Sequence, residues 1–215
     1  TSDGSETMSA RLAIHERVLH AKNREELMQA YGEWADHYEA DLVEGEGYVA
    51  PVLSAELLRP YLPGKTARIL DAGCGTGLVG VWLAEHGYTE LTGLDYSAEM
   101  LDRAREKGVY GELLQADLNA PLDLRDAAVD AVICVGTLTL GHVGPGALRE
   151  LARIVAPGGH VCFTVRDEAW AQDDYAGAID ALVAEGVWTP VERQTADYIR
   201  KEGSTCQLCL YRVAA

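Results

Sequence analysis

A turn rich in glycine is the part of this sequence best suited to chemistry. It follows an apolar run that ends at Asp71, and it contains Gly73, Cys74, Gly75 and Gly77. Glycines in a turn let a ligand approach the bare backbone, where side chains would block it. A carboxylate at the entrance to the turn adds a negative charge beside the ligand. We therefore expect these five residues to form a ligand site that favours a cationic group.

Two classes of ligand are compatible with this turn. Residues 75–80 match the G-x-G-x-x-G pattern of dinucleotide-binding proteins, and Asp95 follows at the distance of a ribose-binding acid. A dinucleotide would place its pyrophosphate at the turn, however, where Asp71 would repel it. S-adenosylmethionine carries an ammonium and a sulfonium instead, and a carboxylate stabilises both. The one Tyr-x-x-x-Lys pair that a single-domain dehydrogenase would need, Tyr61 and Lys65, precedes the first expected strand.

Five segments occur in the order typical of one enzyme family. They are residues 70–77, 93–95, 115–118, 129–133 and 156–161. In these segments the chain resembles the class I S-adenosylmethionine-dependent methyltransferases, and the resemblance extends from Tyr31 to Val213. The helical stretch ahead of them is similar to that of the methyltransferase-like proteins of the Williams-Beuren region.

The resemblance implies a role for each segment. The turn wraps the methionine part of the cofactor, Asp95 accepts from both ribose hydroxyls, and Asp117 accepts from the adenine amino group. The cofactor is S-adenosyl-L-methionine, and the product is S-adenosyl-L-homocysteine. An alternative stays open for Asp95 and Asp117, because acids at strand ends also cap the next helix. The implied cofactor-binding residues are Asp71, Gly73, Cys74, Gly75, Gly77, Asp95, Tyr96, Asp117, Leu118, Val135, Tyr31 and Trp34.

His142 and Tyr38 are the candidate catalytic residues. His142 follows the fourth expected strand, and an imidazole with a pKa near 6.5 suits removal of a proton from a methyl acceptor. Tyr38 continues an aromatic stripe with Tyr31 and Trp34, which is similar to the lid of small-molecule methyltransferases. The stripe fits a core-facing helix equally well. A lone histidine is also more often hydrogen-bonded into the fold, and an acceptor that is already deprotonated needs no base.

The elements that position these residues alternate along the chain. From Ala67 onward, short apolar runs alternate with amphipathic segments, as in a mostly parallel sheet. Helices ahead of this core are expected from Arg24, behind a capping box of Asn23 and Glu26, and over residues 49–61. We expect strands at residues 67–71, 90–95, 111–115, 129–135 and 160–166. Helices are expected at 78–86, 97–107, 146–154 and 174–185, with Ser97 as the N-cap of the second, and a hairpin at 187–199 and 204–213.

The expected fold class is α/β. It is a Rossmann-like, doubly wound, seven-stranded, mostly parallel sheet with an antiparallel C-terminal hairpin and an N-terminal helical lid. Residues 1–10 are expected to be a disordered tail, and residues 11–215 a single methyltransferase domain. Within it, residues 11–62 form the lid and residues 63–215 the core. Residues 167–170, after the fifth strand, are expected to form a solvated loop.

Composition limits the partners. The 215 residues carry 34 acidic and 18 basic side chains, a formal net charge of −16. The resulting field repels nucleic acid and anionic lipid, so we expect neither as a partner. Five scattered cysteines fit a reducing cytoplasm, and Cys206 and Cys209 lack the further ligands of a zinc site, so no metal is expected. We expect neither a membrane span nor a secretory signal.

The expected function is transfer of a methyl group from S-adenosylmethionine to a small-molecule acceptor. In-line displacement at a sulfonium requires the nucleophile to be positioned and water excluded, and it needs no metal. Two alternatives stay open: a non-catalytic module that binds S-adenosylmethionine or its product, and an NAD(P)-dependent oxidoreductase. The atom that is methylated and the oligomeric state stay open as well.

Overall fold

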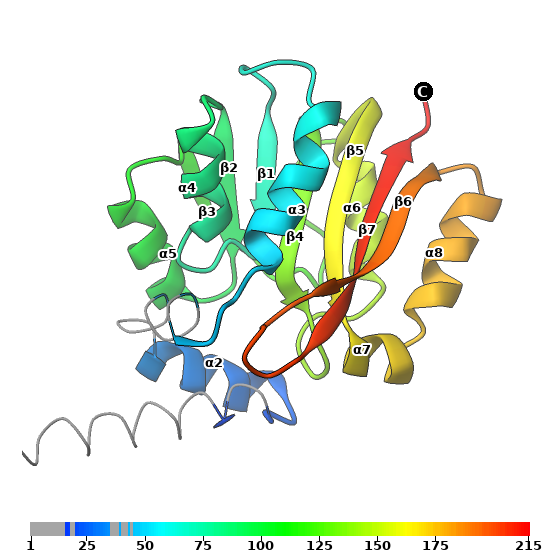
Figure 1. The fold of residues 1–215 in the computed structure, drawn as a ribbon. Helices are drawn as coiled ribbons and strands as arrows, with labels where there is room; N and C mark the ends of the chain where they lie inside the picture. The colour runs from blue at the N-terminus through cyan, green and yellow to red at the C-terminus, as the bar shows by residue number, and fades with distance from the viewer. Residues whose placement is uncertain (1–15, 18–19, 35–38, 40–42, 44) are drawn as a thin grey trace, which may run out of the picture.

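The computed structural model describes residues 16–17, 20–34, 39, 43 and 45–215 of the chain. Its centre is a seven-stranded sheet with the order β3-β2-β1-β4-β5-β7-β6, and helices cover both faces (Figure 1). The strands are β1 (Ile69–Ala72), β2 (Leu91–Asp95), β3 (Glu112–Gln115), β4 (Val129–Leu138), β5 (Val155–Arg166), β6 (Trp188–Asp197) and β7 (Thr205–Val213).

Five strands of the sheet are parallel to one another. β1 pairs with β2 and with β4, β2 pairs with β3, and β4 pairs with β5, all in parallel. β7 runs antiparallel to β5, and β6 runs antiparallel to β7 at the edge of the sheet. The predicted α/β class, its mostly parallel sheet and its C-terminal hairpin are confirmed.

The helices form a layer on each face of the sheet. On one face lie α3 (Ala50–Leu58), α4 (Leu78–Glu85) and α5 (Ala98–Glu106) (Figure 1). On the other lie α6 (Ala147–Arg153), α7 (Asp167–Gln172) and α8 (Tyr175–Ala184). A 3-10 turn, η2 (Arg59–Tyr61), follows α3. The last element, α2 (Arg24–Trp34), lies at the edge where the parallel strands end (Figure 1).

The core explains why β4 reads as a nearly continuous apolar run. Ala131 and Ile133 pack in the cluster beneath α3 and α4, whereas Val132 and Cys134 pack in the cluster beneath α6 and α8. A strand covered on both faces has no solvent side and therefore no polar alternation. The sheet thus separates two hydrophobic layers, and the polar groups that could bind a ligand lie at the strand ends.

Caps begin two of the helices where the sequence predicts them. The side chain of Asn23 accepts from the backbone N–H of Glu26 at 2.9 Å, and α2 begins at Arg24. The carboxylate of Glu26 accepts from the N–H of Lys22 at 3.1 Å, one residue earlier than a capping box requires. At α5, the Ser97 hydroxyl accepts from the N–H of Met100 at 3.3 Å. Ser97 is confirmed as an N-cap.

Two segments differ from the prediction. β5 begins at Val155 rather than at residue 160, because the strand passes through its Pro-Gly-Gly run in a bulge opposite Asp130. A Cβ on Gly159 would lie 2.3 Å from the carbonyl oxygen of Asp130, so the bulge needs glycine there. The loop expected after β5 is the short helix α7, which buries Ala169 and carries Asp167 and Glu168 in its first turn. Acids at that end stabilise a helix through its dipole.

Two further expectations concern the chain as a whole. Within the described residues, no helix is both long enough and apolar enough to cross a membrane. The tail predicted at residues 1–10 lies outside the described residues.

Candidate active site

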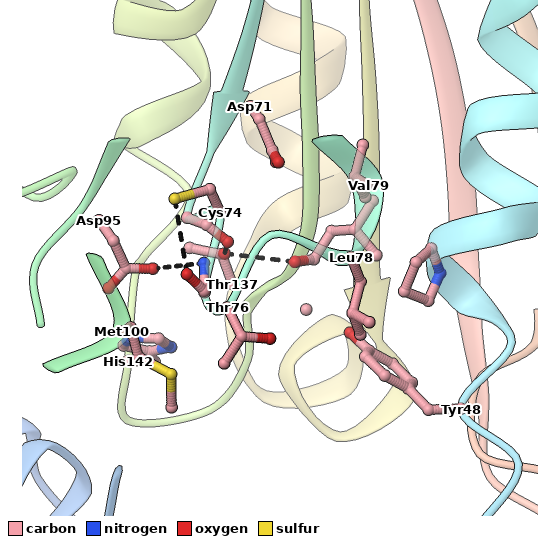
Figure 2. A pocket seen from close by; sticks show the side chains of 15 residues that line it. Tyr48, Asp71, Cys74, Thr76, Leu78, Val79, Asp95, Met100, Thr137 and His142 are labelled. Carbon is pink, nitrogen blue, oxygen red and sulfur yellow. Dashed lines mark hydrogen bonds between the residues drawn. The ribbon is translucent and has the colours of Figure 1, made fainter. Parts of the chain in front are cut away.

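A pocket lies where β1, β2 and β4 end, beside the first turns of α3 and α5 (Figure 2). Its volume is about 530 Å³, counting the open mouth. In open α/β sheets ligands bind at the carboxyl ends of the strands, at the point where the strand order reverses. Here that point lies between β1 and β4. The sequence-predicted residues that line the pocket are Asp71, Gly73, Cys74, Gly75, Asp95, Val135 and His142.

The glycine turn connects β1 to α4 along the pocket wall. Gly73 and Gly75 have φ values of +70° and +55°, in the region that favours glycine. A Cβ on Gly73 would lie 1.8 Å from Oγ1 of Thr137, so the bare backbone allows the turn to approach β4. A Cβ on Gly75 would project into open space. Gly75 is therefore the position at which a ligand can lie against the backbone.

Asp71 and Asp95 bring two carboxylates to the pocket from neighbouring strands (Figure 2). Asp95 accepts from the N–H groups of Gly75 and Ser97, each at 2.9 Å, so it fixes the turn as well as the start of α5. Asp71 is 3% exposed and accepts from the Tyr110 hydroxyl at 2.6 Å. Burial raises the pKa of both acids, that of Asp71 to about 7. Among the described residues, neither acid has a cationic partner.

The ring of Tyr110 occupies a slot made by three glycines. A Cβ on Gly77 would lie 3.2 Å from this ring, one on Gly93 would lie 3.1 Å from it, and one on Gly80 would lie 2.3 Å from its hydroxyl. Gly77 faces this slot and does not line the pocket. The last glycine of the G-x-G-x-x-G pattern therefore admits a tyrosine ring, which accounts for the pattern without a pyrophosphate.

Asp117 and Tyr96 meet the N-terminal helix instead of the pocket. Oδ2 of Asp117 accepts from Nη1 of Arg24 at 2.5 Å, and the Arg24 guanidinium lies 3.6 Å from the centroid of the Tyr96 ring. Burial acts to raise the pKa of Asp117, but hydrogen bonds from Arg24 and from the Asn119 N–H outweigh it, so the pKa is lowered. The acid expected at the adenine is thus paired with α2 in this structure.

His142 lies in the turn after β4 and lines the pocket. The Asn119 side chain donates to the carbonyl oxygen of His142 at 3.0 Å and accepts from the Gly144 N–H at 3.0 Å, which fixes this turn. Burial, aided by the Arg24 cation, lowers the pKa of His142 to about 4. This pKa lies well below the unperturbed value near 6.5 that suits a base at neutral pH. At neutral pH the imidazole is uncharged.

Of four other predicted site residues, Leu118 can be placed, whereas the side chains of three lie outside the described part of the structure. Leu118 is 5% exposed and packs in the core beneath α6 and α8, so it does not form a wall of the pocket. Tyr31 and Trp34 belong to the last turns of α2, but their side chains are not described. Tyr38 lies outside the described residues. The roles of this aromatic stripe therefore stay predictions.

Cys206 and Cys209 do not form a pair. Both lie on β7, but Cys206 packs in the cluster beneath α3 and Cys209 in the cluster on the opposite face of the sheet. Their side chains alternate because a strand has a period of two. Within the described residues, no cluster of His, Cys, Asp and Glu has the arrangement of a metal site.

Comparison with known proteins names the family. A family model described as a methyltransferase domain matches residues 70–163. Methyltransferase-like protein 27 of Homo sapiens is 36% identical over 180 residues, which are 81% of this chain and 73% of that protein. The chain belongs to the class I S-adenosylmethionine-dependent methyltransferases.

Other similarities of this methyltransferase are shorter or more distant. Malonyl-[acyl-carrier protein] O-methyltransferase of Pectobacterium atrosepticum is 36% identical over 146 residues, which are 66% of this chain and 53% of that protein. The chain therefore spans about half the length of this relative. The solved structure of the [4+2]-cyclase SpnF matches with a TM-score of 0.70 at 18% identity, over 91% of this chain and 97% of that one. That similarity shows the fold alone.

The pocket fits the cofactor of a class I methyltransferase, S-adenosylmethionine. Its ammonium and sulfonium carry the charge opposite to that of Asp71 and Asp95, and Gly75 leaves room for it against the backbone. The pyrophosphate of NAD(P) would meet the same two acids and be repelled. Both the negative charge of the pocket and the family of the chain therefore argue against the oxidoreductase alternative.

Several residues of the methyltransferase pocket had no role in the sequence analysis. Tyr48 precedes α3 and Pro51 lies in its first turn, and the packing of α3 against β4 and β5 brings both to the pocket, which no local sequence pattern predicts. Met100 could have been found, since it follows the Ser97 cap by one turn and so lies at the pocket end of α5. The remaining lining residues are Thr76, Leu78, Val79, Gly136 and Thr137.

Proposed function

We propose that this methyltransferase acts on a small-molecule acceptor. The pocket is lined by apolar side chains such as Leu78, Val79 and Met100 with a few polar groups among them, as small-molecule sites are. The net charge of −16 disfavours a polyanionic acceptor such as RNA. The observation that carries the proposal is that His142 lines the same pocket as the two buried acids, so an acceptor bound by His142 would lie beside the cofactor.

The cofactor would be held by the residues at the ends of β1 and β2. Asp95, anchored by Gly75 and Ser97, has the free lone pairs to accept from the ribose hydroxyls. Asp71 would bind the ammonium, and the turn at Gly73 and Gly75 would receive the amino-acid part against its backbone. Bound S-adenosylmethionine supplies an electrophilic methyl group on a good leaving group. The protein must position the acceptor and exclude water.

The adenine would lie toward Tyr96 and Asp117. Both oxygens of Asp117 already accept hydrogen bonds, one from Arg24 and one from Asn119, but a carboxylate can accept about four. Asp117 can therefore bind an adenine amino group beside Arg24. Leu118 would support this region from the core.

We assign His142 to binding the methyl acceptor. A neutral imidazole can accept a hydrogen bond from a hydroxyl or amine and so align its lone pair with the methyl group. With a pKa of about 4 it is a weak base, so it takes the proton only as the acceptor becomes cationic during displacement. Tyr38 is proposed as a second contributor, on a lid formed by residues 11–62 with Tyr31 and Trp34 over a core of residues 63–215. Residues 1–10 are proposed as a disordered tail, and the cytoplasm as the compartment.

Two measurements test the proposal. Calorimetric titration should give one site for S-adenosylmethionine and for S-adenosylhomocysteine, and none for NAD or NADP. Release of S-adenosylhomocysteine should then be measured with panels of small hydroxyl, amine, thiol and carboxylate acceptors, and with RNA as the control. Turnover on RNA alone would refute the small-molecule assignment.

Once an acceptor is known, His142→Ala should lower kcat about 100-fold with unchanged cofactor affinity. His86→Ala is the matched control, since His86 stacks on Trp82 away from the pocket. Full activity of His142→Ala would remove the histidine from the mechanism. The low pKa of His142 further predicts no loss of kcat from this group between about pH 9 and about pH 6.

A further inference from the structure

Tyr110 contacts a residue of the site, although it has no part in the methyl transfer proposed above. It lies just before β3, outside the pocket lining, and its hydroxyl donates to Oδ2 of Asp71 at 2.6 Å. The two residues are 39 positions apart: Asp71 is on β1, and Tyr110 precedes β3, which β2 separates from β1 in the sheet. The contact therefore exists only in the folded protein.

The slot around Tyr110 fixes where its hydroxyl can be. An added methyl group on Gly80 would lie 2.3 Å from the hydroxyl, and one on Gly93 would lie 3.1 Å from the ring. Glycine at these positions lets the ring lie directly against β2 and α4. A ring confined in this way delivers its hydrogen bond at little further cost in conformational entropy.

The other groups around Asp71 do not favour its charge through ion pairing. Asp95 faces it from β2 and opposes its ionisation, and the thiols of Cys74 in the turn and Cys134 on β4 are also near. The backbone N–H of Gly80 on α4 donates to Asp71. Among the described side chains that act on Asp71, only Tyr110 stabilises the ionised carboxylate. A hydrogen bond to the charged form favours that form.

We propose that Tyr110 is a positioning residue for cofactor binding, which keeps the Asp71 carboxylate ionised and aimed into the pocket so that it can bind the cofactor's ammonium group. The inference rests on the proposed role of Asp71 in binding that group. Tyr110 acts through Asp71 and does not itself touch the pocket.

The test is the pH dependence of S-adenosylhomocysteine affinity, measured by calorimetry from about pH 6 to about pH 9. In the wild type, affinity should fall as the pH drops below the Asp71 pKa of about 7, because a protonated acid does not attract an ammonium. Tyr110→Phe keeps the ring but loses the donor, so the Asp71 pKa should rise and this fall should begin at higher pH. At neutral pH the loss should be about 3- to 10-fold, and it should shrink as the pH is raised.

Controls separate positioning from structure. Tyr88→Phe makes the same change in a buried tyrosine outside the pocket and should leave the profile unchanged. Asp71→Asn should weaken binding and abolish the acid limb, and adding Tyr110→Phe to it should have no further effect. Gly80→Ala, which displaces the hydroxyl by a different route, should shift the acid limb in the same direction as Tyr110→Phe.

Each failure has its own meaning. If Asp71→Asn leaves affinity and pH profile unchanged, Asp71 does not bind the ammonium. If Asp71→Asn weakens binding while Tyr110→Phe changes neither affinity nor profile, the inference about Tyr110 is wrong and the role of Asp71 stands. An equal loss at every pH in Tyr110→Phe would also overturn it, since that is the effect of a merely structural tyrosine.

Discussion

The acids at the two ends of the parallel strands differ in their ion pairing and in the direction of their pKa shifts. At the amino end, Asp130 accepts from the backbone N–H of Arg68 at 2.8 Å and from its guanidinium at 3.0 Å and 3.3 Å. The hydrogen bond from the Arg68 side chain lowers the pKa of Asp130. At the carboxyl end, Asp71 and Asp95 are buried without a cationic partner among the described residues, and their pKa values are raised.

A second arginine confirms the contrast. Arg153 bonds to the carboxylates of Glu150 and Asp126 and to the carbonyls of Leu122 and Leu124, tying α6 to the chain that leads into β4. This protein, with 18 basic residues for 34 acidic ones, thus uses arginines where acids support the fold. It leaves acids uncompensated where a cation is to bind, which trades stability for affinity.

The largest effect should come from removing an acid at the carboxyl end. Asp95→Ala should lower affinity for S-adenosylhomocysteine roughly 10- to 100-fold, because ribose hydroxyls would lose a charged acceptor. Calorimetry on the folded variant measures this. Asp102→Ala, on the exposed side of α5, is the control and should bind like the wild type. Unchanged affinity in Asp95→Ala would reduce Asp95 to a residue that only holds the turn.

Next in size is a gain of stability. The folded pKa of Asp71 lies above its unfolded value, so its stabilising contribution is present below about pH 4 and is lost as the pH rises through about 7. Asp71→Asn removes the buried charge and should raise the free energy of unfolding at pH 8 by on the order of 2 kcal/mol. Urea unfolding at several pH values should show this gain vanishing near pH 4. A variant less stable than the wild type at pH 8 would contradict the claim that the buried charge at the carboxyl end costs stability.

Removing a paired charge at the amino end of the strands should lower folding stability instead of raising it. Arg153→Met keeps the aliphatic stem but removes the donor to the carbonyls of Leu122 and Leu124 and the charged partner of Glu150, which should cost about 1.5 kcal/mol of folding stability. Affinity for the cofactor should not change, since the network is remote from the pocket. Thermal unfolding and calorimetry on the same preparation check both halves. A large loss of affinity would mean that the two ends are coupled.

The smallest effect concerns Asp117, an acid at the carboxyl end that is paired with an arginine. Arg24 and Asp117 are partly exposed, with side-chain exposures of 24% and 34%, so their ion pair should be worth less than about 1 kcal/mol. Arg24→Ala should therefore speed amide hydrogen exchange within α2 a few-fold and leave β1 and β4 unchanged. Unaltered exchange in α2 would show that Leu27 and Ala30, both buried, suffice to dock it.

Local chemistry made most of the sheet and part of the site predictable. Apolar runs located the five parallel strands, and Ser97 located the start of α5, because each depends on residues close together in the chain. Asp71 and Asp95 were predictable for the same reason, since Asp71 lies one residue before the end of β1 and Asp95 is the last residue of β2. Their raised pKa values were not, because burial is a property of the assembled core.

What the sequence could not predict depends on distant contacts. Tyr110 and Tyr48 reach the site from segments that bear no motif, and only the packing of β2 and α3 brings them there. His142 was identified from the sequence, but its lowered pKa could not be predicted, because the turn that buries it is held by Asn119. The bulge at the start of β5 was not predicted, since Pro-Gly-Gly more often ends a strand than passes through one.

The five thiols have a practical consequence. All five cysteines are buried, and burial raises the pKa of each, so the native protein should react slowly with maleimides and oxidants. A cysteine introduced at exposed Gln29 on α2 would then be the preferred site of labelling. A fluorophore attached there would report movement of α2 against the sheet while ligand is added, with no native cysteine to remove first.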